Sequence, residues 1–169
     1  MKIHTLAKLA ILTAIALILG FLDSLLSGVV MPVPGMKLGL SNVAILYAVF
    51  FMSPVETAIL MLLKVGLSML LFSNPFGALY SLAGGVLSVA GMRLLRLIPK
   101  ISPIPVSTVG GILHIIGQCL IGFVLFSIRP VLFYAPWLLI CGTVTGVLLG
   151  ILSDGVFKGL DLYNRRCGV

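Results

Sequence analysis

The amino-acid sequence predicts an all-α, polytopic integral membrane protein with about six transmembrane helices in a single compact domain over residues 1–169. The chain is 60% hydrophobic and only 9% charged, which is more apolar surface than a small soluble core can bury. A hydrocarbon layer about 30 Å thick takes roughly 20 residues of helix per crossing. With 169 residues, the chain therefore has room for about six spans and little else.

Proline, glycine and charged residues divide the chain into apolar segments. These segments cover residues 5–27, 39–52, 54–73, 76–97, 106–128 and 133–157. Lys2 and Lys8 precede the apolar run of this first segment, as basic residues do in a signal peptide, but the run continues to Leu26 without a small-residue cleavage site. We therefore interpret it as the first span.

The basic residues predict that both termini are cytoplasmic. With this orientation most of them fall inside: Lys2, Lys8, Arg93, Arg96, Lys100, Lys158, Arg165 and Arg166. Lys37 and Arg129 fall outside, and Lys64 lies within a span. This distribution satisfies the positive-inside rule. The net charge of +7 is therefore attributed to topology and contact with the lipid bilayer, and no nucleic-acid partner is expected.

Several spans carry small residues at helical spacing, which lets helix backbones approach closely in a membrane. The fourth and sixth spans have such sets, and we expect tight packing within the bundle there: Gly77, Ser81, Gly84, Gly85 and Ser88 in the fourth, and Gly142, Gly146 and Gly150 in the sixth. The first span carries Ala7, Ala10 and Ala14. This alanine stripe either packs within the bundle or docks a partner helix.

Residues 32–42, PVPGMKLGLSN, are predicted to form a structured outer loop. The two prolines fit poorly inside a helix, and the two glycines allow tight turns. Non-helical backbone at membrane depth survives only where it is buried in protein or lines a cavity. The loop is therefore either a lid over a ligand site, with Lys37 and Asn42 supplying a cation and an amide, or a plain turn with Lys37 solvated.

Polar residues within the spans are costly and usually face a bundle interior or a cavity. Lys64 lies near the middle of the third span, where either an ion pair with Asp23 or an anionic ligand could stabilise it. His114 and Gln118 are four residues apart and share a helix face. The histidine is either an interhelical hydrogen-bonding group or a ligand or proton carrier. Tyr80 is either an interface anchor or a ligand contact.

Missing motifs argue against autonomous catalysis. The chain has no G-x-x-x-x-G-K-[ST] sequence, so any active transport draws its energy from another subunit or an ion gradient. The clustered carboxylates that hold Mg²⁺ against a diphosphate are also missing. Cys119, Cys141 and Cys167 stand far apart without a C-x-x-C motif. We expect no metal site, no cofactor and no enzymatic activity.

Four segments together resemble a known family: LGFLDSLL, PVPGMKLGLSNVAILYAVF, FGALYSLAGGVLS and GGILHIIGQCLIGFVLF. In this order they resemble the Gx transporter family, whose members are often labelled heptaprenyl diphosphate synthase component I. That family is similar in turn to the substrate-binding S components of energy-coupling-factor (ECF) transporters, which are six-helix membrane proteins without an ATPase of their own.

The resemblance implies a role for each candidate residue. In S components an alanine motif on the first helix docks a transmembrane coupling subunit, and the first outer loop covers a small-molecule substrate. The candidate docking residues are Ala7, Ala10 and Ala14. The candidate substrate-binding residues are Asp23, Lys37, Asn42, Lys64, Tyr80, His114 and Gln118.

Two positions depart from the family pattern, which usually has glutamate at position 23 and asparagine at position 115. Asp23 keeps the charge with a shorter reach. Ile115 removes an amide that could contact a ligand, so the substrate does not follow from relatives. Lys37 and Lys64 favour a carboxylate or phosphate, but Asp23 or backbone carbonyls can equally satisfy a lysine.

The leading functional hypothesis is an S component of an ECF-type importer in the bacterial cytoplasmic membrane. It would capture a small molecule beneath the 32–42 loop and release it inward when a coupling subunit and ABC ATPases reorient the bundle. One alternative is a non-catalytic accessory membrane subunit of heptaprenyl diphosphate synthase, serving isoprenoid or menaquinone synthesis. Another is a stand-alone carrier in which Lys64 and His114 couple to protons.

Overall fold

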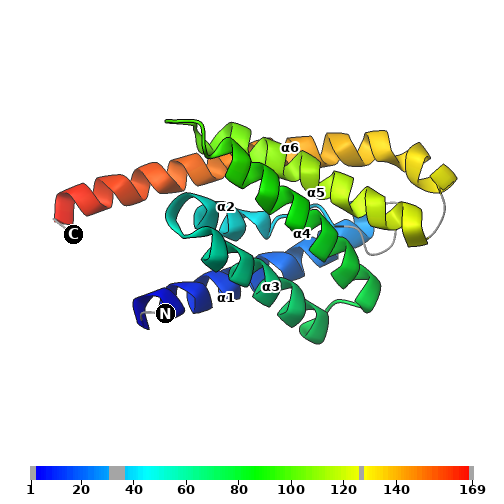
Figure 1. The fold of residues 1–169 in the computed structure, drawn as a ribbon, viewed down its shortest axis with the longest axis horizontal. Coiled ribbons are helices and arrows are strands. Elements are labelled where there is room, and N and C mark those ends of the chain that lie inside the picture. The colour runs from blue at the N-terminus through cyan, green and yellow to red at the C-terminus, as the bar shows by residue number, and fades with distance from the viewer. Residues whose placement is uncertain (1–2, 31–36, 126–127, 168–169) are drawn as a thin grey trace.

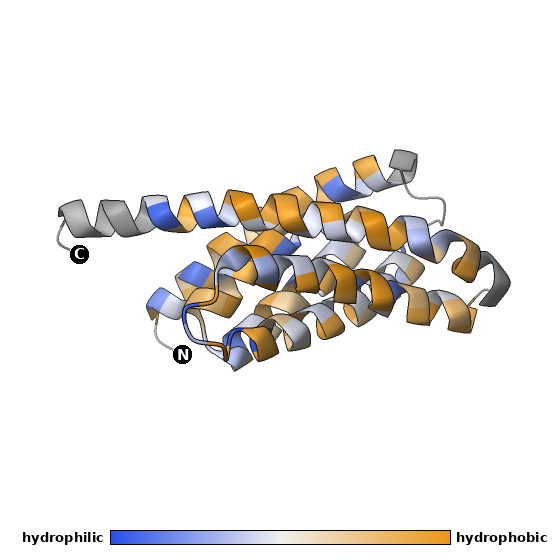
Figure 2. Ribbon diagram, turned by 90° about the horizontal axis from the view of Figure 1, so that it is seen from above, coloured by the Kyte–Doolittle hydropathy of each residue, from blue (hydrophilic) through white to orange (hydrophobic). Residues whose placement is uncertain are grey.

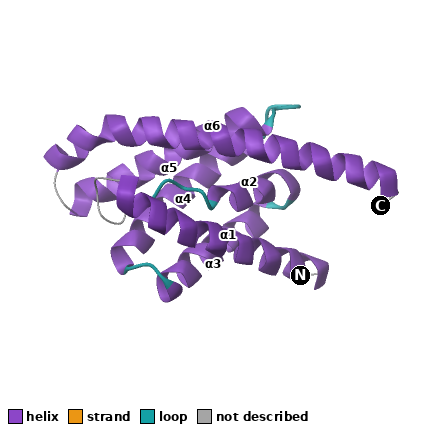
Figure 3. Ribbon diagram, turned by 180° about the vertical axis from the view of Figure 1, so that it is seen from behind, coloured by secondary structure: helices purple, strands orange, loops and turns teal. Residues whose placement is uncertain are grey.

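The structure of the protein is a computed structural model that describes residues 3–30, 37–125 and 128–167, and every regular element in these ranges is a helix (Figures 1 and 3). The helices are α1 (Ile3–Val30), α2 (Asn42–Phe51), α3 (Pro54–Leu71), α4 (Pro75–Leu95), α5 (Pro103–Leu125) and α6 (Ile128–Cys167). The predicted all-α class is therefore confirmed. The first half of the predicted outer loop, with Pro32, Pro34 and Gly35, lies outside the described residues.

Five of these helices are long and apolar enough to cross a membrane: α1, α3, α4, α5 and α6. Figure 2 shows them drawn largely in orange, the colour of hydrophobic residues. Side chains that face lipid need no polar cover, which explains why large apolar residues such as Leu70 and Val124 are 80% and 81% exposed. The protein is therefore a multi-pass membrane protein.

The helix α2 differs from the others, because it has only 10 residues and is about 15 Å long, half the thickness of the hydrocarbon layer. It is also deeply buried, with Ile45, Leu46 and Val49 each 1% exposed. The predicted span at 39–52 thus corresponds to a short helix and the non-helical turn that leads into it. This turn places backbone amides and carbonyls inside the bundle.

The start of α1 and the end of α6 lie at the same end of the bundle (Figure 1). The turn between α4 and α5, which carries Lys100, lies at this end too (Figures 1 and 3). Basic residues are concentrated in the segments found here, among them Lys8, Arg93 and Lys158. Their concentration favours assigning this end to the cytoplasm.

Glycines bring α4, α5 and α6 into close contact. A β-carbon added to Gly146 would lie 2.9 Å from the carbonyl oxygen of Ser107, and one added to Gly150 would lie 2.7 Å from the α-carbon of Ile104. A β-carbon on Gly117 would lie 2.6 Å from the carbonyl oxygen of Ala83. Such distances leave no room for a side chain, so the predicted tight packing through small residues is confirmed.

Arg93 of α4 joins the end of α2 to the start of α3. Its Nη2 atom donates hydrogen bonds to the carbonyl oxygens of Met52 (2.8 Å) and Ala48 (3.3 Å) and to the hydroxyl of Thr57. The Ala48 carbonyl also accepts a hydrogen bond from the Met52 amide (2.9 Å), and the dipole of α2 favours a cation at this C-terminal end. The start of α3 is fixed separately by a capping box between Ser53 and Glu56.

Candidate functional site

A small polar cavity lies inside the bundle, between α1, the turn before α2, α3, α4 and α5. Predicted site residues form part of its wall: Asp23, Lys37, Lys64 and His114. The remaining wall residues are small: Ala16, Gly20, Ser41, Ser68 and Ser81. The cavity volume is about 10 Å³, which is room for roughly one water molecule. The structure is therefore closed around this site.

Asp23 fixes the turn before α2 to α1. It is 1% exposed, and its Oδ1 atom accepts hydrogen bonds from the backbone amide of Leu38 (3.0 Å) and the hydroxyl of Ser27 (3.1 Å). Its Oδ2 atom accepts a hydrogen bond from the amide of Gly39 (2.9 Å). The Ser27 oxygen also accepts from the Leu38 amide at 3.1 Å. A carboxylate that accepts backbone amides in this way holds the segment firmly.

Gln118 of α5 fixes the same turn from the opposite side. Its Oε1 atom accepts a hydrogen bond from the backbone amide of Lys37 (3.0 Å), and its Nε2 atom donates one to the carbonyl oxygen of Lys37 (2.9 Å). The side-chain amide of Gln118 thus bonds both backbone groups of Lys37, as a neighbouring strand would in a β-sheet. Side chains from two separate helices thus bond the three amides of residues 37–39 and the carbonyl of Lys37, as buried backbone requires.

Lys64 reaches the cavity from α3 and is 6% exposed. Its Nζ atom donates a hydrogen bond to the Oδ1 atom of Asn42 at 3.3 Å. No direct ion pair joins Lys64 to Asp23, whereas Lys158 and Asp154 of α6 pair at 2.6 Å. The predicted alternative of a direct Asp23–Lys64 pair is therefore wrong for this closed state, because hydrogen bonds to the turn occupy the carboxylate.

Lys37 lies at the outer rim of the cavity, in the turn itself. Its Nζ atom donates to the hydroxyl of Ser73 (3.3 Å) and lies 5.7 Å from the ring centre of Phe72. Partial burial lowers the pKa of Lys37 below its ordinary value, and the nearby carboxylate of Asp23 opposes this. The alternative of a plain turn with a fully solvated lysine is therefore wrong.

His114 fills the space between the turn and α4. It is 2% exposed, and its Nδ1 atom has no hydrogen-bond partner among the described residues. Two glycines make room for the ring: a β-carbon on Gly84 would lie 2.8 Å from Nδ1, and one on Gly39 would lie 3.4 Å from Cδ2. Gly39 also has a φ of +93°, a conformation that other residues rarely adopt.

The structure does not bring Tyr80 into this cavity. Tyr80 is completely buried in an apolar cluster between α4, α5 and α6, together with Ile115 and Leu138, and its hydroxyl has no partner among the described residues. Ile115 also faces α6, since a β-carbon on Gly142 would lie 2.5 Å from its Cγ1 atom. The departure from the family pattern at position 115 therefore removes nothing from the cavity wall.

Sequence reasoning missed several serines at this site. Ser27 and Ser73 bond the turn and Lys37 directly, and Ser41, Ser68 and Ser81 line the cavity. Ser27 and Ser68 had a usable signal, because they lie four residues after Asp23 and Lys64 and therefore on the same helix faces. Serines are common in membrane helices, so the others had no pattern that distinguished them.

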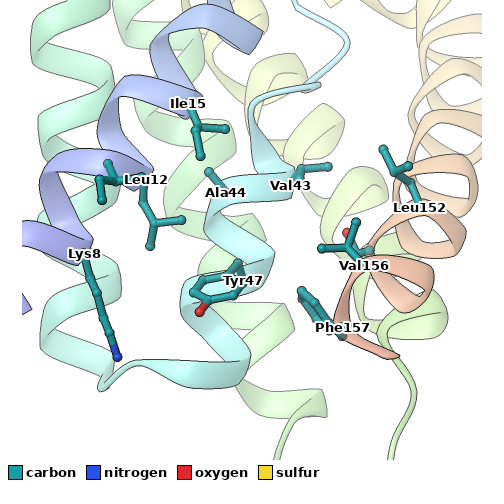
Figure 4. Close-up of a pocket in the computed structure, with 11 residues that line it drawn as sticks. Lys8, Leu12, Ile15, Val43, Ala44, Tyr47, Leu152, Val156 and Phe157 are labelled. Atoms are coloured by element: carbon teal, nitrogen blue, oxygen red, sulfur yellow. The ribbon is translucent and has the colours of Figure 1, made fainter. Parts of the chain in front are cut away.

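A second, larger hollow lies on the surface between α1, α2 and α6, with a volume of about 390 Å³. Figure 4 shows side chains of all three helices turned toward it, with Lys8, Tyr47 and Phe157 near its lower edge. The rest of its lining is almost entirely apolar. Without convergent polar groups it cannot orient a polar ligand.

The alanine stripe of α1 is exposed. Ala7, Ala10 and Ala14 all lie on the surface of the bundle. Of the two predicted alternatives, packing within the bundle is therefore wrong. The stripe remains open to lipid or to another protein.

Metal ligands are not gathered at any point in the described ranges. Among the residues that the structure describes, no group of three or more His, Cys, Asp or Glu side chains could hold a metal ion. The polar cavity has only Asp23 and His114 of these residue types. Its chemistry is that of hydrogen bonding and charge.

The fold and the cavity together define a multi-pass helical membrane protein with a closed internal polar site. The family model described as heptaprenyl diphosphate synthase component I matches residues 12–156, and the chain belongs to this family. The resemblance found in the sequence motifs is thereby confirmed. No curated protein and no solved structure matches the chain.

Proposed function

We propose that the protein is the substrate-binding S component of an ECF-type importer in the bacterial cytoplasmic membrane. One observation carries this proposal: a non-helical segment, residues 37–39, folds over a buried polar cavity and is held there by Asp23 and Gln118. In a membrane bundle, backbone of this kind is tolerated where it lines a cavity. A closed polar cavity under a turn is what a capture protein needs.

The proposed capture cycle follows from the closed geometry. The cavity holds about one water molecule (10 Å³), so a substrate enters only when residues 37–39 move away from it. That movement breaks the hydrogen bonds of Asp23 and Gln118 to the turn, and it exposes Lys64 and His114. Asp23 and Gln118 thus hold the turn closed, while Lys64 and His114 are left to contact the substrate.

Inward release needs a source of energy that this chain lacks. No P-loop sequence is present, so the proposal requires a transmembrane coupling subunit with ABC ATPases. The exposed alanine stripe on α1 is the proposed docking surface, because small side chains let another helix approach closely. It lies in the first half of α1, toward the end of the bundle assigned to the cytoplasm.

Affinity purification from the native membrane in mild detergent tests the proposal. We expect a coupling subunit and paired ATPases to co-purify with the wild-type chain. Ala10→Leu with Ala14→Leu should abolish this co-purification and leave the yield of folded protein unchanged. Ala90→Leu is the matched control, since Ala90 is exposed on α4 and lies outside the stripe.

The family description supports a second candidate, a non-catalytic membrane subunit of a prenyl diphosphate synthase. This chain would then anchor or regulate a soluble enzyme, because it lacks the clustered carboxylates that hold Mg²⁺ against a diphosphate. Co-purification of a soluble prenyl diphosphate synthase subunit without ATPases would favour this candidate and contradict the importer.

A further inference from the structure

We infer that the ligand of the polar cavity carries an oxyanion, a carboxylate or a phosphate group, which binds between Lys64, His114 and the N-terminus of α2. The inference rests on the proposed function only in taking this cavity as the ligand site. It adds the chemical class of the ligand. Four features of the closed structure carry it.

The charges around the cavity are unbalanced. Two lysines, Lys37 and Lys64, contribute to its wall, against one carboxylate, Asp23. Both oxygens of Asp23 already accept hydrogen bonds from the turn. The charge of Asp23 offsets one of the two lysines, so the wall keeps a formal charge of +1, which a negative group in the cavity would balance.

Lys64 has unused hydrogen-bonding capacity. An ammonium group has three donors and no acceptor. Its one hydrogen bond among the described residues is the 3.3 Å bond to Asn42, and the side chain is only 6% exposed. An oxyanion would supply the missing acceptors together with the missing charge.

The N-terminus of α2 opens on the same cavity. Ser41, the residue that precedes the helix, is 3% exposed and lines the cavity, but its side chain does not cap the first turn. The amides of Asn42 and Val43 already donate to the carbonyl oxygens of Gly39 (2.9 Å) and Leu40 (3.3 Å), so what this N-terminus offers an anion is the positive end of the helix dipole. Asn42, the first residue of this helix, also holds Lys64 in place.

His114 supports a ligand at this site for a reason that does not depend on charge. The ring lines the cavity, is 2% exposed, and has a buried Nδ1 atom without a partner among the described residues. Buried nitrogen atoms of this kind are rare in native proteins, because losing water without gaining a partner costs free energy. The imidazole can donate a hydrogen bond to an oxyanion in either protonation state.

A melting experiment tests the inference with simple anions. The full chain is purified in lipid nanodiscs, and its Tm is compared in sodium phosphate, sodium acetate and sodium chloride at matched pH and ionic strength. We expect phosphate or acetate, at millimolar concentration, to raise the Tm above its value in chloride, because a ligand of the folded state stabilises it. The anion that raises the Tm more shows whether the ligand group is a phosphate or a carboxylate.

Variants locate the effect. Lys64→Met should weaken the apparent affinity for the active anion by about tenfold or more, the size expected when a charge-assisted hydrogen bond is lost. Lys8→Met and Lys158→Met remove cations outside the cavity and should respond like the wild type. Equal Tm values in the three salts, or an unchanged response of Lys64→Met, would overturn the inference.

A measurement on the wild type decides the question if Lys64→Met does not fold. The protein is labelled with an amine-acylating reagent, and the modification of each lysine is followed by mass spectrometry. Phosphate or acetate should slow the labelling of Lys37, at the rim of the cavity, relative to Lys8. An unchanged ratio would overturn the inference.

These results are distinct from those of the co-purification. If anions raise the Tm but no ATPases co-purify, the ligand class is supported and the importer proposal is excluded. If ATPases co-purify but no anion changes the Tm, the importer proposal is supported and the ligand class is excluded.

Discussion

The Oδ2 atom of Asp23 accepts a hydrogen bond of 2.9 Å from the backbone amide of Gly39, two residues that lie 16 positions apart in the chain. This bond holds residues 37–39, the turn before α2, over the polar cavity. The other oxygen of Asp23, Oδ1, accepts a hydrogen bond of 3.0 Å from the amide of Leu38, so both carboxylate oxygens bind the turn. The short side chain of Asp23 brings the backbone of the turn close to α1.

Asp23→Asn should loosen the turn. The amide has one acceptor oxygen instead of two, so one backbone amide of the turn faces an NH₂ group, and the loss is expected to be about 1–3 kcal/mol. Hydrogen exchange of the peptide covering residues 37–41, measured in nanodiscs, should accelerate by about tenfold or more. Asp154→Asn is the control, since Asp154 pairs with Lys158 on the surface of α6. Unchanged exchange in Asp23→Asn would contradict the role of this carboxylate.

Gln118→Leu should loosen the same turn from the side of α5. The substitution removes both hydrogen bonds to the backbone of Lys37 and leaves the two groups unpaired. Because Asp23 and Gln118 hold one short segment, their effects should couple. The double variant is expected to cost less than the sum of the single variants, by about 0.5–3 kcal/mol. Hydrogen exchange of residues 37–41 measures this cycle, and strict additivity would show that the two residues act on separate segments.

Much of the fold could be predicted from the proline, glycine and charged residues that separate the apolar segments. Pro54, Pro75 and Pro103 each stand at the first position of a helix, where the missing amide costs nothing. The predicted segments agree with α1 to α5 to within about three residues, but α6 (Ile128–Cys167) begins earlier and ends well beyond the predicted segment 133–157. The alanine stripe was also found, but only the structure shows that it is exposed.

The partners within the site could be predicted only in part. Asp23, Lys64 and His114 were recognisable because ionisable groups are rare in spans. Which group meets which depends on the path of the turn, and no helical periodicity describes that path. Tyr80 carried the same signal as the cavity residues, yet it faces the apolar cluster of α5 and α6.

Gly39→Ala should destabilise the turn before α2. The φ of +93° and a β-carbon 3.0 Å from Nδ2 of Asn42 are expected to cost about 1–3 kcal/mol together. Gly66→Ala is the matched control, because a β-carbon there meets no atom within 4 Å and alanine is the better helix former by up to about 1 kcal/mol. A lower Tm for Gly39→Ala and an equal or higher Tm for Gly66→Ala is the expected pair of results. Equal effects would show that the turn is not constrained at Gly39.

Arg93→Met should weaken the bundle at the end where α2 meets α3. The substitution leaves the carbonyl oxygens of Ala48 and Met52 without the guanidinium that now binds them, at an expected cost of about 2 kcal/mol for hydrogen bonds to a charged group. Arg96→Met is the comparison. Arg96 lies 4.8 Å from the ring centre of Phe50, and losing such a contact costs about 0.5–1 kcal/mol at exposed sites.

The free energy of unfolding in detergent, measured by denaturant titration, should therefore fall more for Arg93→Met than for Arg96→Met. Exchange at residues 37–41 should stay at the wild-type rate in both variants, because Arg93 holds the C-terminal end of α2 while Asp23 and Gln118 hold the turn before its N-terminal end. If exchange at residues 37–41 also accelerated in Arg93→Met, α2 would be moving as one rigid body, so that loosening its C-terminal end would also loosen the turn before its N-terminal end. The arginine would then belong to the closing mechanism as well as to the packing of α2 against α3.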